Sequence, residues 1–333
     1  MIRRLAAGLA LVIGVTFVTF TLTHLVPGDP AVAALGEFAI DNPQAVEAFR
    51  ERYRLDDPLP VQYGAYLANI VQGDLGVSQR TRRPVLQELA EFIPATFELA
   101  IVAIIIAIVV GLTFGTIAAV RKDGILDQVI RVFSLTGISM PAFWLALLAF
   151  YWLSFRYQIF PGIGRLDPGV RAPPTVTGMY TVDALLAGDW ETFRNAASHS
   201  FLPAAVLAAN AIGLLTRFTR SAVLEVLEED FIRTARAKGL RARKVVVTHV
   251  LRAALVPVVT LIGLMFGSVL SGTVLVEAIF SWPGVGQYAF LGANHLDVPA
   301  IAGVAMFVAV AYLTINLVVD LLYGAIDPRI RVQ

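Results

Sequence analysis

Long runs of apolar residues that contain no charged side chain alternate with polar segments along this chain. A helix needs about 20 such residues to cross the hydrocarbon core of a bilayer. Six runs come close to or exceed that length, at residues 5–28, 99–120, 132–155, 201–216, 253–276 and 299–319. The fourth is the shortest and extends back to Ala196 through His199. The pattern predicts an all-α polytopic membrane protein with six transmembrane helices, and an even number places both termini on one side.

The composition supports this prediction. Hydrophobic residues make up 57% of the 333 residues and the mean hydropathy is +0.72, whereas soluble domains average about 45–50% apolar. The chain has no cysteine, which excludes disulfides, Cys-ligated metal centres and thiol nucleophiles. The formal net charge of +1 says little by itself, so the distribution of charge carries the information.

Basic residues gather in the polar loop 217–253, between the fourth and fifth runs. Seven Lys or Arg residues lie between Asp230 and Pro257, where Asp230 is the only acid. Loops rich in Lys and Arg stay in the cytoplasm during insertion. We therefore expect this loop and both termini to be cytoplasmic. The segments 29–93, 156–198 and 277–298 then lie outside.

Gly239 divides the basic loop. The residues before it, from about Leu224, favour a helix, and a glycine at its end can adopt the left-handed cap without a Cβ penalty. The residues after it begin a second helix that leads into the fifth run at Ala253. This order predicts a helix, a turn and a return to the membrane, presented as a protruding knob.

Segment 29–93 is too polar for lipid and is predicted to be an extracytoplasmic helical cap. Residues 1–28 form a retained transmembrane helix ended by Pro27 and Pro30, and residues 94–333 form the core, with the second span following Pro94. Within the cap, helices are expected from Pro43 and over 61–71. Three nearby arginines read as solvated surface, so no nucleic-acid partner is predicted.

A second group of candidates lies inside the apolar runs. Pro141 should kink the third run, as a moving part or as an ordinary feature of membrane helices. Gly263 and Gly267 share one helix face, and small residues at that spacing allow close approach of helices. The sequence therefore leaves two roles open, contact between helices or lining of the transport pathway. The candidates for these roles are Pro141, Asn210, Gly263, Gly267, Ser268 and Ser271.

The sequence lacks the motifs that several kinds of chemistry require. The three lysines follow Arg121, Ala237 and Arg243, so no Gly-Lys pair of a phosphate-binding loop occurs. The four histidines are isolated, and no paired carboxylates or nucleophile motif is found. We therefore predict no catalytic residue, no metal site and no cofactor bound by this chain. Such a protein conducts passively or is driven by another polypeptide, and the knob favours the second.

Residues Arg233 to Gly239 resemble the EAA loop of ABC importer permeases, which docks into the ATP-binding subunit. Ala235 and Gly239 match the general Glu-Ala-Ala, three residues, Gly pattern, whereas Arg233 and Thr234 replace its first two positions. The variant is similar to that of the dipeptide/oligopeptide (DppB/OppB-like) transmembrane subunit family. Further blocks agree in order along nearly the whole chain, at 25–30, 55–59, 73–78, 94–99 and 277–286.

This resemblance implies a type I ABC importer permease fold in a bacterial or archaeal plasma membrane. The implied partners are a second related permease subunit, two ATP-binding subunits that carry ATP and magnesium, and an extracytoplasmic solute-binding protein. The implied cargo is di- and oligopeptides, with nickel, glutathione, an opine, a sugar or haem as alternatives, and a stand-alone channel or secondary transporter as the competing class. The implied docking residues are Arg233, Thr234, Ala235, Arg236, Ala237, Lys238, Gly239 and Leu240.

Overall fold

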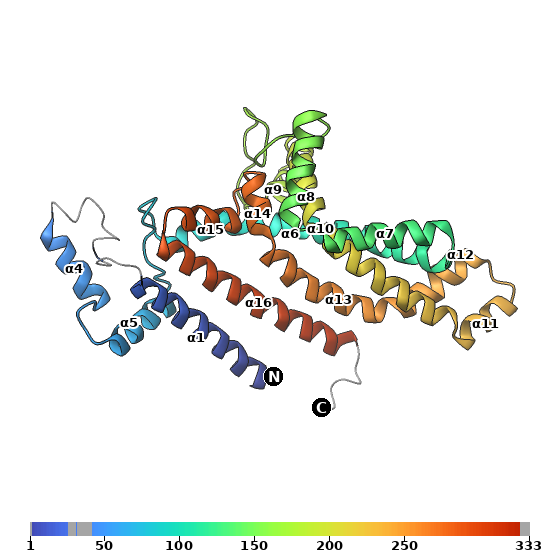
Figure 1. Cartoon of the computed structure of the whole chain (residues 1–333), viewed down its shortest axis with the longest axis horizontal. Helices are drawn as coiled ribbons and strands as arrows, with labels where there is room; N and C mark the ends of the chain where they lie inside the picture. Colours follow the sequence, from blue (N-terminus) through green and yellow to red (C-terminus); the bar gives the residue numbers. More distant parts are fainter. Residues whose placement is uncertain (1, 26–30, 32–41, 327–333) are drawn as a thin grey trace. The chain divides into compact units, whose positions relative to one another are not determined.

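The computed structural model describes residues 2–25, 31 and 42–326, and in these ranges it consists of helices and loops, with no sheet (Figure 1). The all-α prediction is confirmed. In chain order the helices are α1 (Ile2–Leu25), α4 (Pro43–Tyr53), α5 (Leu59–Val71), α6 (Val85–Val120), α7 (Ile125–Ser139), α8 (Ala142–Ala149), the π-helix η1 (Phe150–Arg156), α9 (Tyr180–Leu186), α10 (Trp190–Leu227), α11 (Asp230–Ala237), α12 (Ala242–Lys244), the π-helix η2 (Val245–Val250), α13 (Leu251–Ser271), α14 (Thr273–Ile279), α15 (Val285–Asn294) and α16 (Val298–Ile326).

Three of the described helices are long and apolar enough to cross a membrane by themselves, namely α6, α10 and α16. Two bent pairs, α7 with α8 and η1, and the later part of α13 with α14, bring the total to as many as five. Within α1, the described apolar stretch is the shorter Val12–Thr21. The count of six spans therefore stays a prediction. The residues expected to end the first span, Pro27 and Pro30, lie outside the described ranges.

The third apolar run is broken at Pro141. The prediction of one kinked helix over 132–155 is wrong, because α7 ends at Ser139 and the chain turns by 108° into α8. Met140 has an extended backbone with ψ 130°, since a residue before proline is disfavoured in the helical region. Pro141 then begins α8 by accepting amide hydrogen bonds from Trp144 and Leu145 at 3.1 Å.

At Pro94, unlike at Pro141, the helix continues without a break. Helix α6 begins at Val85 and carries Pro94 in its interior, so the predicted second span, 99–120, is the later part of a longer helix, and its start after Pro94 stays a prediction. Proline costs the helix one backbone hydrogen bond. Packing offsets that loss, since Val85 and Leu89 are buried in a cluster with Tyr288 and Val304.

Caps in the sequence explain where several other helices start. The expected helix at Pro43 is confirmed as α4, where the Asn42 side chain accepts the Ala45 amide at 3.1 Å. The expected helix over 61–71 is confirmed as α5. Helix α10 starts inside the predicted loop 156–198, where Asp189 accepts the Thr192 amide at 3.0 Å. The fourth apolar run is thus the middle of a 38-residue helix.

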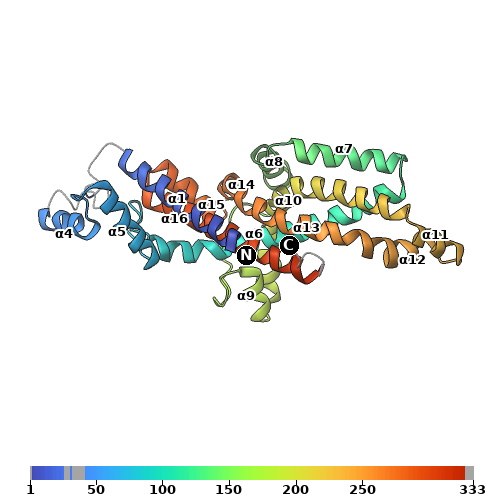
Figure 2. The ribbon, with the colours of Figure 1, turned by 90° about the horizontal axis from the view of Figure 1, so that it is seen from below.

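The described chain forms two compact units. One contains residues 1–94 and 283–313, and the other contains 95–282 and 314–333. In the second unit α10 lies between α7 and α13 (Figure 2). The buried residues shared by α6, α10 and α13 form its main core, which includes Leu99, Leu215 and Val258.

Glycines allow the helices of the second unit to approach closely. A Cβ on Gly115 of α6 would lie 2.7 Å from the Thr216 carbonyl oxygen of α10. A Cβ on Gly137 of α7 would lie 2.8 Å from the Ala209 carbonyl oxygen of the same helix α10. Backbone atoms cannot move aside as a flexible side chain can, so these positions require glycine. Gly111 precedes Gly115 by four residues, the same spacing that singled out Gly263 and Gly267.

Candidate functional site

The basic loop folds into a compact element, here called the basic knob, that comprises residues 228–250. Helix α11 buries one face, since Ile232 is fully buried and Ala235 is 8% exposed. These side chains pack against Val223 of α10, Ala119 of α6 and Val245 of η2. Residues three apart lie on one face of a helix. The basic knob is therefore attached to the ends of two long helices, α6 and α10, and is not a free loop.

Gly239 forms the turn of the basic knob. Its φ is +76°, a backbone conformation that residues with a Cβ rarely adopt. Its amide donates to the Arg236 carbonyl at 2.9 Å, and the Leu240 amide donates to Ala235 at 3.4 Å. No atom lies within 4 Å of where a Cβ would be. Backbone conformation, and not space, therefore calls for glycine here, and the predicted left-handed cap is confirmed.

The outward face of the basic knob carries a net positive charge, since it exposes six Lys or Arg side chains against the three acids Glu228, Glu229 and Asp230. Of the eight predicted docking residues, the structure buries Ala235 and half-buries Leu240, and it exposes Arg233, Thr234, Arg236, Ala237, Lys238 and Gly239. The ion pair of Arg233 with Asp230 at 3.2 Å is exposed at both ends, so it contributes little stability. The cations are available to a partner with an acidic or polar cleft. Their role in docking remains a prediction.

The predicted pathway residues are dispersed over three helices. Asn210 is exposed on α10, and its Nδ2 lies 3.4 Å from the Ile138 carbonyl oxygen, close to the break before Pro141. On α13, Gly267 is buried, Gly263 is half-buried and Ser268 is exposed. The side chain of Ser271 lies outside the described set. The structure thus brings Asn210 to the broken end of α7, and it places the α13 residues separately.

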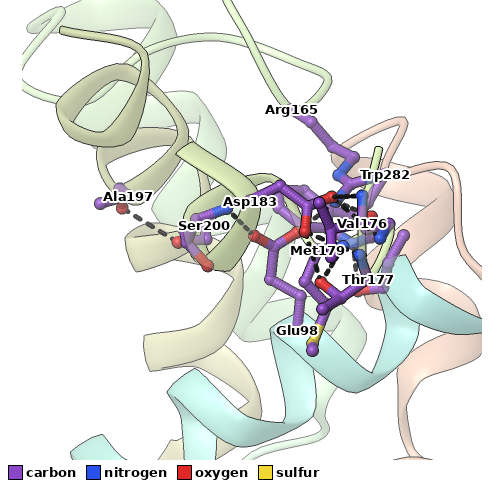
Figure 3. Close-up of polar contacts among 12 residues, drawn as sticks. Glu98, Arg165, Val176, Thr177, Met179, Asp183, Ala197, Ser200 and Trp282 are labelled. Carbon is purple, nitrogen blue, oxygen red and sulfur yellow. Dashed lines mark hydrogen bonds and ion pairs between the residues drawn. The ribbon is translucent and has the colours of Figure 1, made fainter. Parts of the chain in front are cut away.

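A second polar site surrounds Glu98 of α6. It is here called the Glu98 cluster and comprises Glu98, Arg165, Gly178, Tyr180, Thr181 and Trp282. Figure 3 labels Glu98, Arg165 and Trp282. Arg165 Nη2 donates to Glu98 Oε2 at 2.5 Å and to the Gly178 carbonyl at 2.8 Å. The Thr181 amide donates to Glu98 Oε1 at 2.6 Å. Both oxygens of the buried carboxylate are therefore satisfied, as burial of a charge requires.

Aromatic rings complete the surroundings of Arg165. The guanidinium lies 3.5 Å from the centre of the Tyr180 ring and 5.7 Å from that of Trp282, within the range of a cation–π interaction. Trp282 Nε1 donates to the Ala95 carbonyl of α6 at 2.9 Å. The Glu98 cluster thus ties the segment 165–181 and the turn after α14 to residues 95–98 in the interior of α6.

Asp183 folds the neighbouring segment around its carboxylate (Figure 3). It accepts the amides of Val176, Thr177 and Gly178 at 3.2, 2.8 and 2.9 Å, and the Thr177 hydroxyl at 2.7 Å. Burial alone would raise the pKa of Asp183, but these hydrogen bonds outweigh it and hold the pKa below its ordinary value. The segment therefore has a defined conformation although it is not helical.

The Glu98 cluster and the basic knob lie at opposite ends of the uncharged part of one helix, α6. Glu98 and Ala119 both belong to α6, and the 21 steps from one residue to the other correspond to about 32 Å at 1.5 Å per residue. The hydrocarbon core of a bilayer is about 30 Å thick. The residues between them are apolar, so α6 has the length to place the two polar sites at the two surfaces of a membrane.

Sequence reasoning missed the Glu98 cluster. In the sequence Glu98 stands out only as part of the block 94–99, and its partner Arg165 lies 67 positions away in a loop with no regular pattern. Single-sequence periodicity cannot pair such residues. The spacing of Gly111 and Gly115, in contrast, carried a signal that could have been used. Among the residues that the structure describes, no three His, Asp or Glu side chains gather as a metal site would require.

Comparisons with known proteins identify the family. The model of the binding-protein-dependent transport system inner membrane component matches residues 111–332, and the model of the N-terminal part of such membrane components matches residues 1–100. The chain belongs to this family. It is therefore a multi-pass membrane component of a binding-protein-dependent transporter, located in the plasma membrane.

Curated relatives match over nearly the full chain. The chain is 47% identical to a probable D,D-dipeptide transport system permease protein, DdpB, of Escherichia coli, over 99% of this chain and 97% of that protein. It is 41% identical to a dipeptide transport system permease protein, DppB, of Alkalihalophilus pseudofirmus, over 99% and 98%. It is 42% identical to a di/tripeptide transport system permease protein, DppB, of Pseudomonas aeruginosa, over 99% and 98%.

A solved structure shares the fold. An inward-facing structure of the MetNI methionine ABC transporter matches with a TM-score of 0.54 and 16% sequence identity, over 73% of this chain and 97% of that chain. At this identity the match bears on the arrangement of helices alone. It supports the ABC permease fold that the EAA-like residues implied.

Proposed function

We propose that this family member is the permease subunit of an ATP-driven importer of di- and oligopeptides, forming half of the translocation pathway. The three relatives described above match over 97% or more of their own length and are named as dipeptide or di/tripeptide permeases, which supports peptide cargo. The proposal includes six spans with both termini in the cytoplasm, a helical cap over 29–93 and a core over 94–333.

The basic knob is the observation that carries the proposed mechanism. Its exposed face carries a net positive charge, and its buried face packs on α6 and α10. A rigid attachment of this kind suits an element that receives force, because a displaced α11 must move the helices against which it packs. We assign the docking of a separate ATP-binding subunit to this face, so that ATP and magnesium are bound by the partner and not by this chain.

The partners follow from the same assignment. A second related permease subunit would complete the pathway, two ATP-binding subunits would occupy the cytoplasmic side, and a solute-binding protein would deliver cargo outside. Nucleotide binding can shift the permease between inward- and outward-facing states only if the two states differ in their contacts with the ATP-binding subunits. The displacement of the basic knobs supplies that difference.

Topology can be tested cleanly because the chain has no cysteine. A single cysteine replacing Arg236 should react with a membrane-impermeant thiol reagent only after the cells are permeabilised. A cysteine replacing Arg171, in the segment between η1 and α9, should react in intact cells. Labelling of the Arg236→Cys variant from outside would overturn the proposal.

Cargo requires a separate measurement. Uptake of a radiolabelled dipeptide by cells that express the complete transporter should be inhibited by unlabelled di- and tripeptides, and not by nickel, glutathione, an opine, a sugar or haem. Purification of the chain should also recover ATP-binding subunits in fixed stoichiometry. Recovery of an active carrier without them would favour a stand-alone transporter.

A further inference from the structure

A buried ion pair joins the first turn of α7 to α10. Asp127 is fully buried, and Arg220 Nε and Nη2 donate to its two oxygens, each at 2.8 Å. The Asp123 amide donates to the same carboxylate at 3.0 Å, and Arg131 Nε lies 3.6 Å from it. Two parallel hydrogen bonds fix the relative orientation of a guanidinium and a carboxylate. The pair is therefore a directional joint between two helices.

The rest of this helix contact offers few polar links. The buried hydroxyl of Ser134 on α7 makes no hydrogen bond within the described part of the chain, and the 3.4 Å contact of Asn210 Nδ2 with the Ile138 carbonyl oxygen lies near the other end of α7. Glycines bring the two backbones together, since a Cβ on Gly213 would lie 2.5 Å from the Ser134 carbonyl oxygen. Small-residue contacts of this kind set the distance between helices but allow sliding along them. The Asp127–Arg220 pair is thus placed to prevent such sliding.

The position of Arg220 relates the pair to the basic knob. Three residues later on α10 comes Val223, which is fully buried against Ile232 and Ala235 of α11. On the α7 side of the ion pair, the side chains of Ile125 and Val129 in the first turns of the helix are 80% and 57% exposed. Within the described unit, Asp127 therefore attaches the start of α7 to the stretch of α10 that carries α11.

We propose that Asp127 and Arg220 are positioning residues that transmit the displacement of α11 to α7 during transport. When α11 moves, the apolar contacts of Val223 carry α10 with it, and the ion pair carries α7. Helix α7 ends at the break before Pro141, so its movement is delivered to α8, the next rigid element. The inference rests on the proposed docking of an ATP-binding subunit at the basic knob.

The test measures uptake per ATP hydrolysed in the complete reconstituted transporter. Arg220→Gln and Asp127→Asn each remove one half of the joint, and Arg220→Lys keeps the charge while losing the fork of donors. We expect these variants to assemble with the ATP-binding subunits and to hydrolyse ATP, while uptake per ATP falls at least about fivefold, the lower range of allosteric coupling. Arg83→Gln, which removes an exposed pair with Glu91, should leave that ratio unchanged.

A covalent replacement distinguishes positioning from mere stability. In the double variant Asp127→Cys/Arg220→Cys, a short bifunctional thiol reagent should restore uptake per ATP, because it rejoins the helices. The same reagent on the cysteine-free parent chain controls for thiols of the partner subunits. Recovery supports the proposal.

Three results would overturn it, namely a crosslink that leaves uptake low, a parallel fall of uptake and hydrolysis in every variant, and loss of assembly in all of them. Failure of the unaltered chain to bind ATP-binding subunits would instead refute the proposed function.

Discussion

Arg165 Nη2 lies 2.5 Å from Glu98 Oε2, and the two side chains are 7% and 2% exposed. Removing one member of a buried pair leaves an uncompensated charge, which costs about 3–5 kcal/mol. Arg165→Met should therefore lower the free energy of unfolding by about that amount, measured by titration of the purified protein with a denaturing detergent. The exposed pair of Arg83 and Glu91 is the matched control, and Arg83→Met should lower the free energy of unfolding far less, because exposed ion pairs contribute little stability. Equal losses in the two variants would contradict the structural role assigned to Arg165.

Gly239 supplies a second prediction. A residue with a Cβ loses about 1–2 kcal/mol in the left-handed conformation, and Asn tolerates it better than a β-branched residue does. Gly239→Val should reduce transport and cargo-stimulated ATP hydrolysis without reducing the amount of protein in the membrane, whereas Gly239→Asn should retain most of both. Unchanged uptake in the valine variant would remove the turn from the proposed mechanism.

Asp183 predicts a pH dependence of local stability. Its pKa in the folded chain lies below the ordinary value of 3.8, so the folded state favours the ionised carboxylate. The stabilisation is therefore fully present above the unfolded pKa and is lost as the pH falls through the lower folded pKa. The amide hydrogens of Val176, Thr177 and Gly178 should exchange slowly with solvent deuterium at pH 6. Their protection relative to intrinsic exchange should be no greater at pH 7. Protection relative to intrinsic exchange should be weakened at pH 3, and in Asp183→Asn it should be low at every pH.

Gly213 tests the close packing of α7 and α10. A Cβ there would lie 2.5 Å from the Ser134 carbonyl oxygen, and forcing extra atoms into a packed contact costs about 1–3 kcal/mol. Gly213→Ala should therefore lower the thermal midpoint of the purified protein. Gly64 is the control, because it lies in α5 with nothing within 4 Å of an added Cβ, and alanine is the better helix former. Gly64→Ala should leave the midpoint unchanged or raise it.

Much of the helical architecture could be predicted because it depends on local rules. The apolar runs place α6, α10, α13 and α16, and Gly239 occupies the left-handed turn that its position predicts. The two prolines show the limit of such rules. Pro94 and Pro141 carry the same local penalty, yet tertiary packing retains the helix through one and the chain turns by 108° at the other.

The polar joints could not be predicted from one sequence. Asp127 and Arg220 are 93 positions apart, and Glu98 and Arg165 are 67 apart. Each of these residues reads as an ordinary charge near the end of an apolar run. Only the packing of α10 against α7, and of the segment 165–181 against α6, gives them their partners.

Trp282 offers an optical consequence of the Glu98 cluster. It is 1% exposed beside a guanidinium, whereas the chain's other three tryptophans, Trp144, Trp152 and Trp190, are 44%, 46% and 63% exposed. Replacing those three by phenylalanine would leave a single shielded indole whose emission colour depends on the nearby cation. Such a protein would report, without any attached dye, when the segment carrying Arg165 leaves α6 during a transport cycle.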